Sequence, residues 1–464
     1  HEDTFYIITT NVYTPPGEDK PARFINFIIT AKNIEGPWSD PHVLEGAPGI
    51  DPDIFFDDDG KVWYTGTHTP DDPEFDGQGE IWLQEIDLQT WALTGERFFL
   101  WRGACGGLWV EGPHLYKRNG WYYLLVAEGG TSFNHAVMVA VSKDIRGPYT
   151  SNPRNPIFTS RHLSYDNWVH STGHGDLIEL QDGRWYMVVL GIRADEGRGS
   201  NMGRQTHLVP VIWEREPFEW KMIKHEWPVC APHKGRVARI NPSPFGNTRQ
   251  SPRDVFYDDF TSQELDLEWN FRRVPAPGIY SLRANPGHLR LFALPEVIRE
   301  RESYSFIGFR QRETDFEYLV SMKFTLEGEG DEAGVTLIQK DESYIKFTVL
   351  HQEGSNILRL VLAEPEKAPS VLKQDLMPGY NDRVVFKVIS GDYYWRYEYS
   401  LDDCESYRAF AETNANLLLS RGYTGAYLGL YATSNGHITG GFADFDWVRY
   451  QSFPRGYRFF QGVQ

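Results

Sequence analysis

Two acidic residues, Asp51 and Glu111, lie in surroundings that suit proton transfer. Asp51 is followed by proline and Glu111 by Gly-Pro, so the backbone beside each carboxylate is constrained. Ile50 and Trp109 are close to them in sequence, and an apolar environment raises the pKa of a carboxyl group by disfavouring its charged form. For a single acid the usual explanation is a turn cap, because aspartate is common in turns. The shared flanks favour a chemical role for both residues.

A pair of carboxylates of this kind can cleave a glycosidic bond. One acid must deliver a proton to the leaving oxygen, and a second carboxylate must activate water or attack the sugar. A further negative neighbour can keep the acid protonated. Asp176 is a third acid near the corresponding sequence position, with a turn cap as the alternative explanation. These residues predict acid–base chemistry on a sugar.

The elements that carry these acids repeat along the first half of the chain. Each repeat has an acidic residue, an apolar strand, an Asx-Gly turn of the tight-hairpin type and an aromatic-rich strand. Asp51 and Glu111 are 60 residues apart, and Glu111 and Asp176 are 65 apart. This period, filled with short strands and almost without helical periodicity, predicts the blades of a β-propeller. The repeated stretches are 50–67, 110–127 and 174–191.

The blade count predicts an incomplete ring. Three full blades begin near residues 48, 108 and 172, and residues 1–40 supply only the later strands of another. Because a propeller hides its strand edges by closing, we expect that the first part of this blade is missing. A Pro-, Ser- and Asn-rich linker and a second strand-rich region, which predicts a β-sandwich, follow the propeller. The predicted domains are the propeller at 1–240, the linker at 241–257 and the sandwich at 258–464.

The composition narrows the classes of partner. The formal net charge is −18, and an acidic surface repels nucleic acid and anionic membranes. Aromatic residues make up 15% of the chain, which core packing explains first and sugar stacking second. No apolar run long enough to span a membrane is present. The three cysteines and the lack of an Asn-X-Ser/Thr acceptor favour an intracellular location, but the chain starts without Met or a signal segment and leaves secretion open. A homo-oligomer is also left open.

At these residues the chain resembles glycoside hydrolase family 43, in particular its β-xylosidase branch. The resemblance rests on GIDPDIFFDDDGKVWYTGT, WVEGPHLYKRNGWYYLLVAEGGT, STGHGDLIEL and NMGRQTHLVPVIWE, with GFADFDWVRY near the end. It implies an all-β fold, in which a five-bladed-type β-propeller lacking its first blade precedes a concanavalin A-like, jelly-roll β-sandwich. It also implies hydrolysis with inversion at the anomeric carbon.

The resemblance assigns roles to residues by motif. Glu111 resembles the general acid, and Asp51 resembles the carboxylate that tunes the pKa of the acid and orients the sugar. His174 is similar to a histidine near the channel axis, in some members linked to a central ion, and Arg204 to the arginine that holds sugar hydroxyls. Tyr423 is a candidate for a sandwich loop that narrows the site. The alternatives for these last three are a core histidine, a solvated strand end and a packed strand aromatic.

The family's general base has no counterpart in the sequence. It is an aspartate in an early Asp-Pro motif, whereas the Asp-Pro at Asp40 falls in the outer-strand repeat and Asp51 matches another motif. General-base assistance contributes on the order of 10²–10⁴-fold to a rate. We therefore expect residues 1–464 alone to be inactive or poorly folded.

The predicted activity is release of xylose from the non-reducing ends of xylo-oligosaccharides or arabinoxylan. The alternatives are an α-L-arabinofuranosidase or bifunctional enzyme, a catalytically inactive carbohydrate-binding protein, and a propeller scaffold for protein partners. The carboxylates argue against the scaffold. No dinucleotide, P-loop or HExxH motif is present, so no cofactor and no metal are predicted beyond the ion near His174 that the resemblance leaves open.

Overall fold

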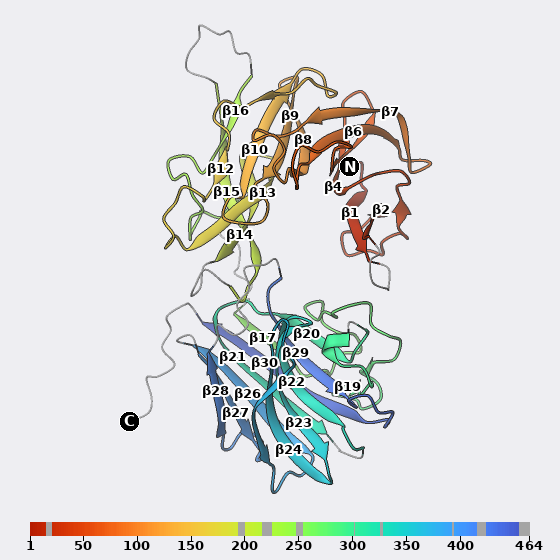
Figure 1. Ribbon diagram of the computed structural model, residues 1–464, viewed down its shortest axis with the longest axis vertical. Helices are drawn as coiled ribbons and strands as arrows, with labels where there is room; N and C mark the ends of the chain where they lie inside the picture. The colour runs from red at the N-terminus through yellow and green to blue at the C-terminus, as the bar shows by residue number, and fades with distance from the viewer. Residues whose placement is uncertain are drawn as a thin grey trace. The chain divides into compact units, whose positions relative to one another are not determined.

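The computed structural model describes residues 1–14, 21–193, 200–215, 225–246, 254–300, 302–324, 328–391, 394–414 and 424–453. The chain forms two compact units (Figure 1). The first comprises His1–Ile192 and Gln205–Pro244, and the second Arg193–Arg204 and Phe245–Gln464. Both are built from strands, and the short 3₁₀-helix η3 (Ile298–Glu300) is the helical element of the described residues, so the all-β prediction is confirmed. No described helix is long and apolar enough to cross a membrane.

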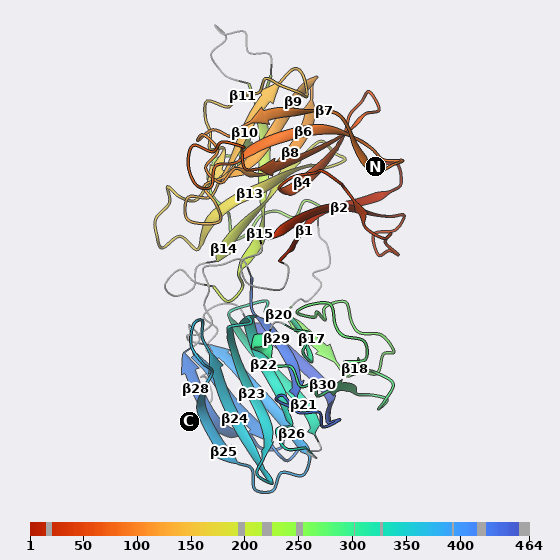
Figure 2. The same ribbon diagram turned by 45° about the vertical axis from the view of Figure 1, so that its right-hand side comes forward.

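The first unit contains four sheets that follow one another along the chain (Figure 2). The first sheet consists of β1 (Phe5–Tyr13), β2 (Arg23–Ala31) and β3 (His42–Val43). The second sheet consists of β4 (Ile50–Phe56), β5 (Val62–His68), β6 (Glu80–Asp87) and β7 (Ala92–Trp101). The third consists of β8 (Glu111–Arg118), β9 (Trp121–Glu128), β10 (Ala136–Ser142), β11 (Thr150–Ser151) and β12 (Phe158–Thr159). The fourth consists of β13 (Val169–Glu179), β14 (Trp185–Arg193), β15 (Arg204–Glu214) and β16 (Trp227–Cys230).

Tight turns join the first two strands of the second, third and fourth sheets, where the sequence predicts them. Between β8 and β9, Arg118 pairs with Trp121, and the two residues of the turn are Asn119 and Gly120. Their φ angles are 50° and 70°, and positive φ at both central residues is the geometry that matches the twist of a hairpin. In each of these three sheets, the first strand lies at the edge and pairs with only one strand of its own sheet.

Alternating side chains of β9 pack against two different sheets. Leu124 and Val126 belong to a buried cluster that includes side chains of β5 and β6, whereas Tyr123 and Leu125 belong to a cluster that includes side chains of β13 and β14. Successive side chains of a strand point to opposite faces of its sheet. The sheets therefore stack face to face, as predicted for propeller blades.

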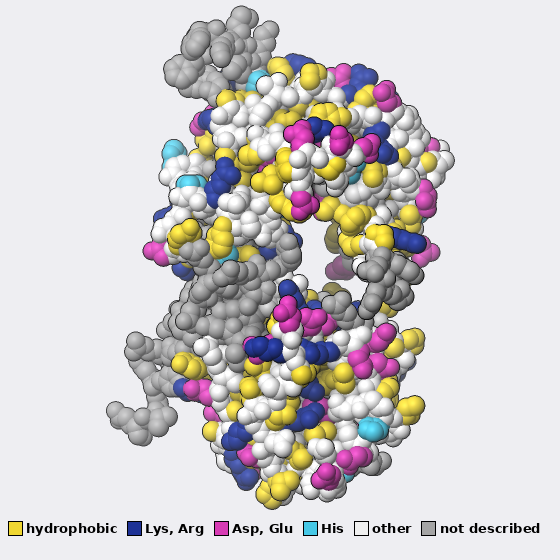
Figure 3. Space-filling view, in the orientation of Figure 1, with side chains coloured by type: hydrophobic (Ala, Val, Ile, Leu, Met, Phe, Trp, Pro, Cys, Tyr) yellow, Lys and Arg dark blue, Asp and Glu magenta, His cyan; other side chains and the backbone are white. Residues whose placement is uncertain are grey.

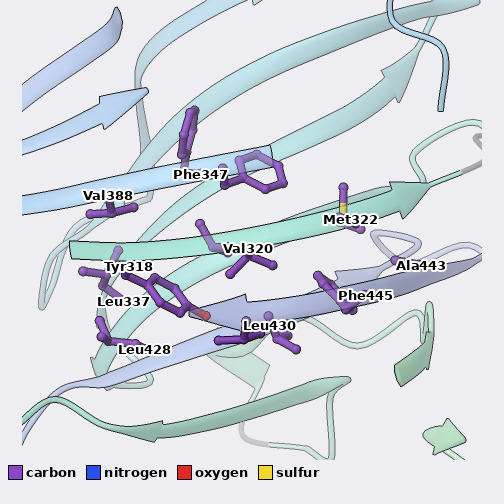
Figure 4. Close-up of a cluster of buried hydrophobic side chains, with 14 of the residues drawn as sticks. Tyr318, Val320, Met322, Leu337, Phe347, Val388, Leu428, Leu430, Ala443 and Phe445 are labelled. Atoms are coloured by element: carbon purple, nitrogen blue, oxygen red, sulfur yellow. The ribbon is translucent and has the colours of Figure 1, made fainter. Parts of the chain in front are cut away.

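The second unit is a two-sheet sandwich around one large apolar core. Figure 4 shows part of this core, and its labelled residues Val320, Leu337, Phe347 and Phe445 are each fully buried. On the face in Figure 3, acidic and basic side chains are interspersed over the surface of this unit. One sheet contains β20 (Phe306–Arg310), β29 (Tyr427–Thr433), β22 (Glu332–Lys340), β23 (Ser343–Gln352), β24 (Ser355–Ala363) and β25 (Ser370–Leu376). The other contains β17 (Val255–Asp258), β18 (Tyr280–Ser281), β19 (Leu289–Phe292), β30 (Phe442–Phe453), β21 (Asp315–Phe324), β26 (Arg383–Gly391), β27 (Tyr394–Ser400) and β28 (Arg408–Asn414).

A buried charge network lies on β22 to β24. The Glu332 carboxylate is fully buried and accepts hydrogen bonds from Lys346 Nζ at 3.0 Å, Arg359 Nε at 3.1 Å and Thr348 Oγ1 at 2.6 Å. Burial alone would raise the pKa of Glu332, but the two neighbouring cations outweigh it and hold the pKa well below its usual range. A buried charge of this kind is tolerated only while its partners are present.

Replacing Glu332 with glutamine is expected to destabilise the sandwich by about 3–5 kcal/mol, because the buried Lys346 and the half-buried Arg359 lose their carboxylate. Since the pKa of Glu332 is lower in the folded than in the unfolded state, its contribution is present at neutral pH and is lost as the pH falls. The difference in the free energy of unfolding between wild type and Glu332→Gln, measured by urea unfolding, should therefore be smaller at pH 3 than at pH 7. Glu364→Gln, which breaks the exposed pair with Lys367, is the matched control and should cost less than about 1 kcal/mol. Equal losses in both variants would show that the buried network is not stabilising.

Candidate active site

The first strands of three sheets lie side by side and carry the predicted acids. β4 contacts β8, and β8 contacts β13 (Figure 2). The pairing of β4 with β5 shifts register between Ile50 and Asp53, and that of β8 with β9 shifts between Glu111 and His114. β-bulges of this kind turn side chains away from the regular alternation and are common beside active sites. Asp51 and Glu111 thus lie at two equivalent irregularities in neighbouring strands.

The backbone repeats an unusual conformation at these two irregularities and at His174 on β13. Asp51, Gly112 and His174 have φ angles of 52°, 57° and 52°. We call these three residues the first row. Positive φ in a residue other than glycine costs on the order of 1–3 kcal/mol and persists where the surrounding structure enforces it, often at functional sites. Glu111 directly precedes the first row on β8.

Asp51 is joined directly to the strand that carries Glu111. The Gly112 N–H donates to Asp51 Oδ2 at 3.2 Å. Burial raises the pKa of Asp51, the nearby His174 opposes this rise, and the negative charge of Glu111 adds to it. Like charges at short range disfavour the state in which both carboxyl groups are ionised. The arrangement is suited to keeping one proton on the pair, as a general acid requires.

His174 lies against Glu111 and Gly112. Its Nδ1 is 3.8 Å from Glu111 Oε1, and about a quarter of each side chain is exposed (25% and 23%). A Cβ atom at Gly112 would lie 2.6 Å from His174 Nε2, which is closer than real side chains approach. Glycine at position 112 is therefore required both by its positive φ and by the histidine ring.

Replacing Gly112 with alanine is expected to displace Glu111 and His174 and to lower both stability and turnover. An alanine at positive φ costs roughly 1–2 kcal/mol, and the contact with the His174 ring adds to that cost. Gly60→Ala is the matched control, because Gly60 has φ of 82° but a Cβ atom there would have no atom within 4 Å. Urea midpoints and turnover of the two variants would be compared. If Gly112→Ala has the same urea midpoint and the same turnover as Gly60→Ala, the close packing of the first row is not needed for stability or for activity.

A metal ion could also be held near this row. Glu111, His135 and His174 bring ligand atoms within 4.8 Å of one another, and a carboxylate with two imidazoles suits first-row divalent ions. The His135 ring is fixed by its Nδ1, which lies 3.1 Å from the Ser171 carbonyl oxygen. An ion bound there would occupy the carboxylate beside Asp51. We therefore treat Glu111 as a proton-transfer group and assign no metal to it.

A pocket of about 310 Å³ opens at the first row. Ile8, Thr9, Thr10 and Val12 of β1 line one side, and Asp51, His114 and His174 are among the residues opposite. Among the described residues that line this pocket, Asp51 is the only carboxylic acid. The side of the pocket formed by β1 therefore offers hydroxyl and apolar groups but no carboxylate.

Arg204 is not among the residues that line this pocket. Arg204 is half-buried and is the first residue of β15. By its contacts it groups with the second unit, while Gln205 groups with the first. Tyr423 lies outside the described residues. Their sugar-binding roles stay predictions.

The structure reveals a second row of polar residues. The sequence interpretation missed Asp53 and His114. It also wrongly placed Asp176 at the position of Asp51, which His174 occupies on β13. Asp53, His114 and Asp176 follow the first row by two positions on β4, β8 and β13. His114 Nδ1 lies 3.4 Å from Asp53 Oδ1, and the Tyr116 hydroxyl donates to Asp176. Side chains two positions apart on a strand share a face, so aligning the repeats at the first row would have revealed this second row.

Comparison with known proteins shows the family of the chain and supports the fold. A "Xylosidase/arabinosidase" of Butyrivibrio fibrisolvens is 37% identical over 96% of this chain and 84% of its own length. The chain belongs to glycosyl hydrolases family 43. The model of that family matches residues 1–217, and the model of the "Beta xylosidase C-terminal Concanavalin A-like domain" matches 257–451.

Other members of family 43 resemble the chain along nearly its whole length. A "Non-reducing end alpha-L-arabinofuranosidase" of Bacteroides ovatus is 31% identical over 97% of the chain and 80% of its own length. The crystal structure of a xylan β-1,4-xylosidase from Bacillus halodurans has a TM-score of 0.84 at 29% identity and covers 97% of this chain and 85% of that one. The predictions of a propeller followed by a concanavalin A-like sandwich, and of a glycosidase, are confirmed.

Proposed function

We propose that this family 43 glycosidase releases xylose from the non-reducing ends of xylan-derived oligosaccharides with inversion at the anomeric carbon. Glu111 is the general acid that protonates the leaving oxygen, and Asp51 keeps it protonated and orients the sugar. The observation that carries this proposal is the hydrogen bond from the Gly112 N–H to Asp51, which fixes the two carboxyl groups on neighbouring strands. The names of the relatives, which include xylosidases, support the sugar.

An α-L-arabinofuranosidase, alone or together with xylosidase activity, is the alternative substrate class. Three of the relatives carry arabinosidase or arabinofuranosidase in their names. The chain should be assayed with nitrophenyl β-xyloside and nitrophenyl α-L-arabinofuranoside under identical conditions, with azide present as the external nucleophile. A higher kcat/KM for the xyloside supports the proposal. A higher kcat/KM for the arabinofuranoside would mean that the enzyme releases arabinose instead of xylose.

We propose further that the water-activating carboxylate is not supplied by residues 1–464. The pocket supports this, since among its described lining residues the only carboxylic acid is Asp51, which the proposal already uses. An inverting mechanism needs a carboxylate on the face of the sugar opposite the acid. A small external anion that attacks the anomeric carbon itself should then replace the missing step.

A binding protein without turnover is the second candidate function, and the same pocket composition favours it. It predicts that xylobiose binds to the chain in calorimetry while no sugar is released, with or without an added anion. Arg204 and His174 are the residues that we propose hold the sugar in either case, and Tyr423 is proposed only as a contributor from the sandwich.

A further inference from the structure

The second row makes polar contacts on both sides of β8, next to the proposed catalytic pair. Asp53 uses both carboxylate oxygens on β8: Oδ1 faces His114 Nδ1 at 3.4 Å, and Oδ2 accepts the Leu115 N–H at 3.2 Å. The Tyr116 hydroxyl, on the same strand, donates to Asp176 and accepts the Leu177 N–H at 2.8 Å. β8 is thus held from both sides immediately after the bulge that carries Glu111.

His114 is surrounded by acidic groups from both neighbouring strands. Asp51 and Asp53 act on it from β4, and Asp176 acts on it from β13. Burial alone would lower the pKa of His114, but the ion pair with Asp53, together with the charges of Asp176 and Asp51, raises it to about 9. At neutral pH the imidazole is therefore a cation, and it lines the pocket beside Asp51 and His174.

We propose that His114, clamped by Asp53, is a positioning residue for the Asp51–Glu111 pair. His114 lies three residues after Glu111 on β8, so its fixed position sets where the bulge, and with it the Glu111 carboxyl group, lies against β4. Its positive charge favours the ionised form of Asp51. The inference rests on the proposed roles of Asp51 and Glu111.

The physical reason for a second row is electrostatic. Asp51 is driven towards its neutral form by burial and by Glu111, and a neutral Asp51 could not hold the proton on Glu111. The imidazoles that oppose this rise in the pKa of Asp51 are those of His174 in the first row and His114 in the second. Asp53 and Asp176 in turn keep His114 charged. The charge state of Asp51 in the first row therefore depends on the acids of the second row.

The test is an NMR titration that needs no turnover. Histidine imidazole nitrogens and aspartate carboxyl carbons would be isotope-labelled and followed against pH in wild type, Asp53→Asn and His114→Gln. In wild type, His114 should titrate near pH 9, and in Asp53→Asn its midpoint should fall towards or below the ordinary 6.5. In His114→Gln, the midpoint of Asp51 should rise, because a neighbouring cation has been removed.

His288→Gln is the matched control, because His288 lies 3.8 Å from Asp446 in the sandwich. It should leave the titrations of Asp51 and His114 unchanged. A wild-type His114 that titrates at or below 6.5, or an Asp51 midpoint that does not move in His114→Gln, overturns the inference even if the variants fold less well. If these titrations behave as expected while Glu111→Gln leaves turnover unchanged, the proposed function fails but the electrostatic arrangement stands.

Discussion

Replacing Glu111 with glutamine is expected to lower the turnover of xylobiose by on the order of 10²–10⁴-fold, the usual contribution of general-acid catalysis. A sugar alkoxide is a poor leaving group and needs the proton that glutamine cannot deliver. Nitrophenolate leaves without that proton, so the loss on nitrophenyl β-xyloside should be much smaller. The assays should include a saturating small anion such as azide, so that the attacking step is the same in all variants.

Glu179→Gln is the control for this substitution, because Glu179 is an exposed acid at the end of β13. It should leave the turnover of both substrates unchanged. An equal loss on xylobiose and on nitrophenyl xyloside in Glu111→Gln would mean that Glu111 does not protonate the leaving group. In that case another residue must be the acid, and the role of Asp51 would have to be reconsidered.

Replacing Asp51 with asparagine is expected to lower kcat/KM by about 10²-fold or more, within the range of general acid–base contributions. The amide keeps an acceptor for the Gly112 N–H but removes the negative charge that disfavours ionisation of Glu111. The acid should then lose its proton at lower pH. The alkaline limb of the pH–rate profile should accordingly move to lower pH, which a merely structural loss would not do.

Asp40→Asn is the matched control for Asp51, because Asp40 also precedes a proline but is exposed and lies outside the strands. Its kcat/KM and pH profile should match those of the wild type. An Asp51→Asn variant with a reduced rate but an unmoved alkaline limb would contradict the assignment of Asp51 as the residue that tunes the acid.

The fold could be predicted to a large extent because the repeat is local. The Asx-Gly turns at Asn119 and Asp182 fix where hairpins lie, and the alternation along each strand fixes which side chains are buried. The buried charge of Glu332 could not be predicted, since the strand pattern around it resembles that of an ordinary solvated position. Its partners Lys346 and Arg359 come from two other strands, and only their pairing brings the three together.

The site was predictable where proline or glycine marked the backbone. Asp51 and Glu111 stand beside such residues, and both lie at bulges. His114 and Asp53 also follow a proline, but each occupies an ordinary strand position, and their contact appears only when β4 and β8 lie side by side. The equivalence of Asp51, Gly112 and His174 was also hidden, since three different residue types share one backbone conformation.

If Glu111 and Asp51 have the proposed roles and this chain does not supply the water-activating carboxylate, an external nucleophile should restore turnover. The most direct measurement is turnover of nitrophenyl β-xyloside by residues 1–464 with and without azide, with the product identified by NMR. Azide should raise the rate by on the order of 10²–10⁴-fold, the size of the missing general-base contribution. A bond from azide to the anomeric carbon replaces the bond to the leaving oxygen, so inversion predicts the α-xylosyl azide. Fast release of xylose without azide, or formation of the β-xylosyl azide, would contradict this division of roles.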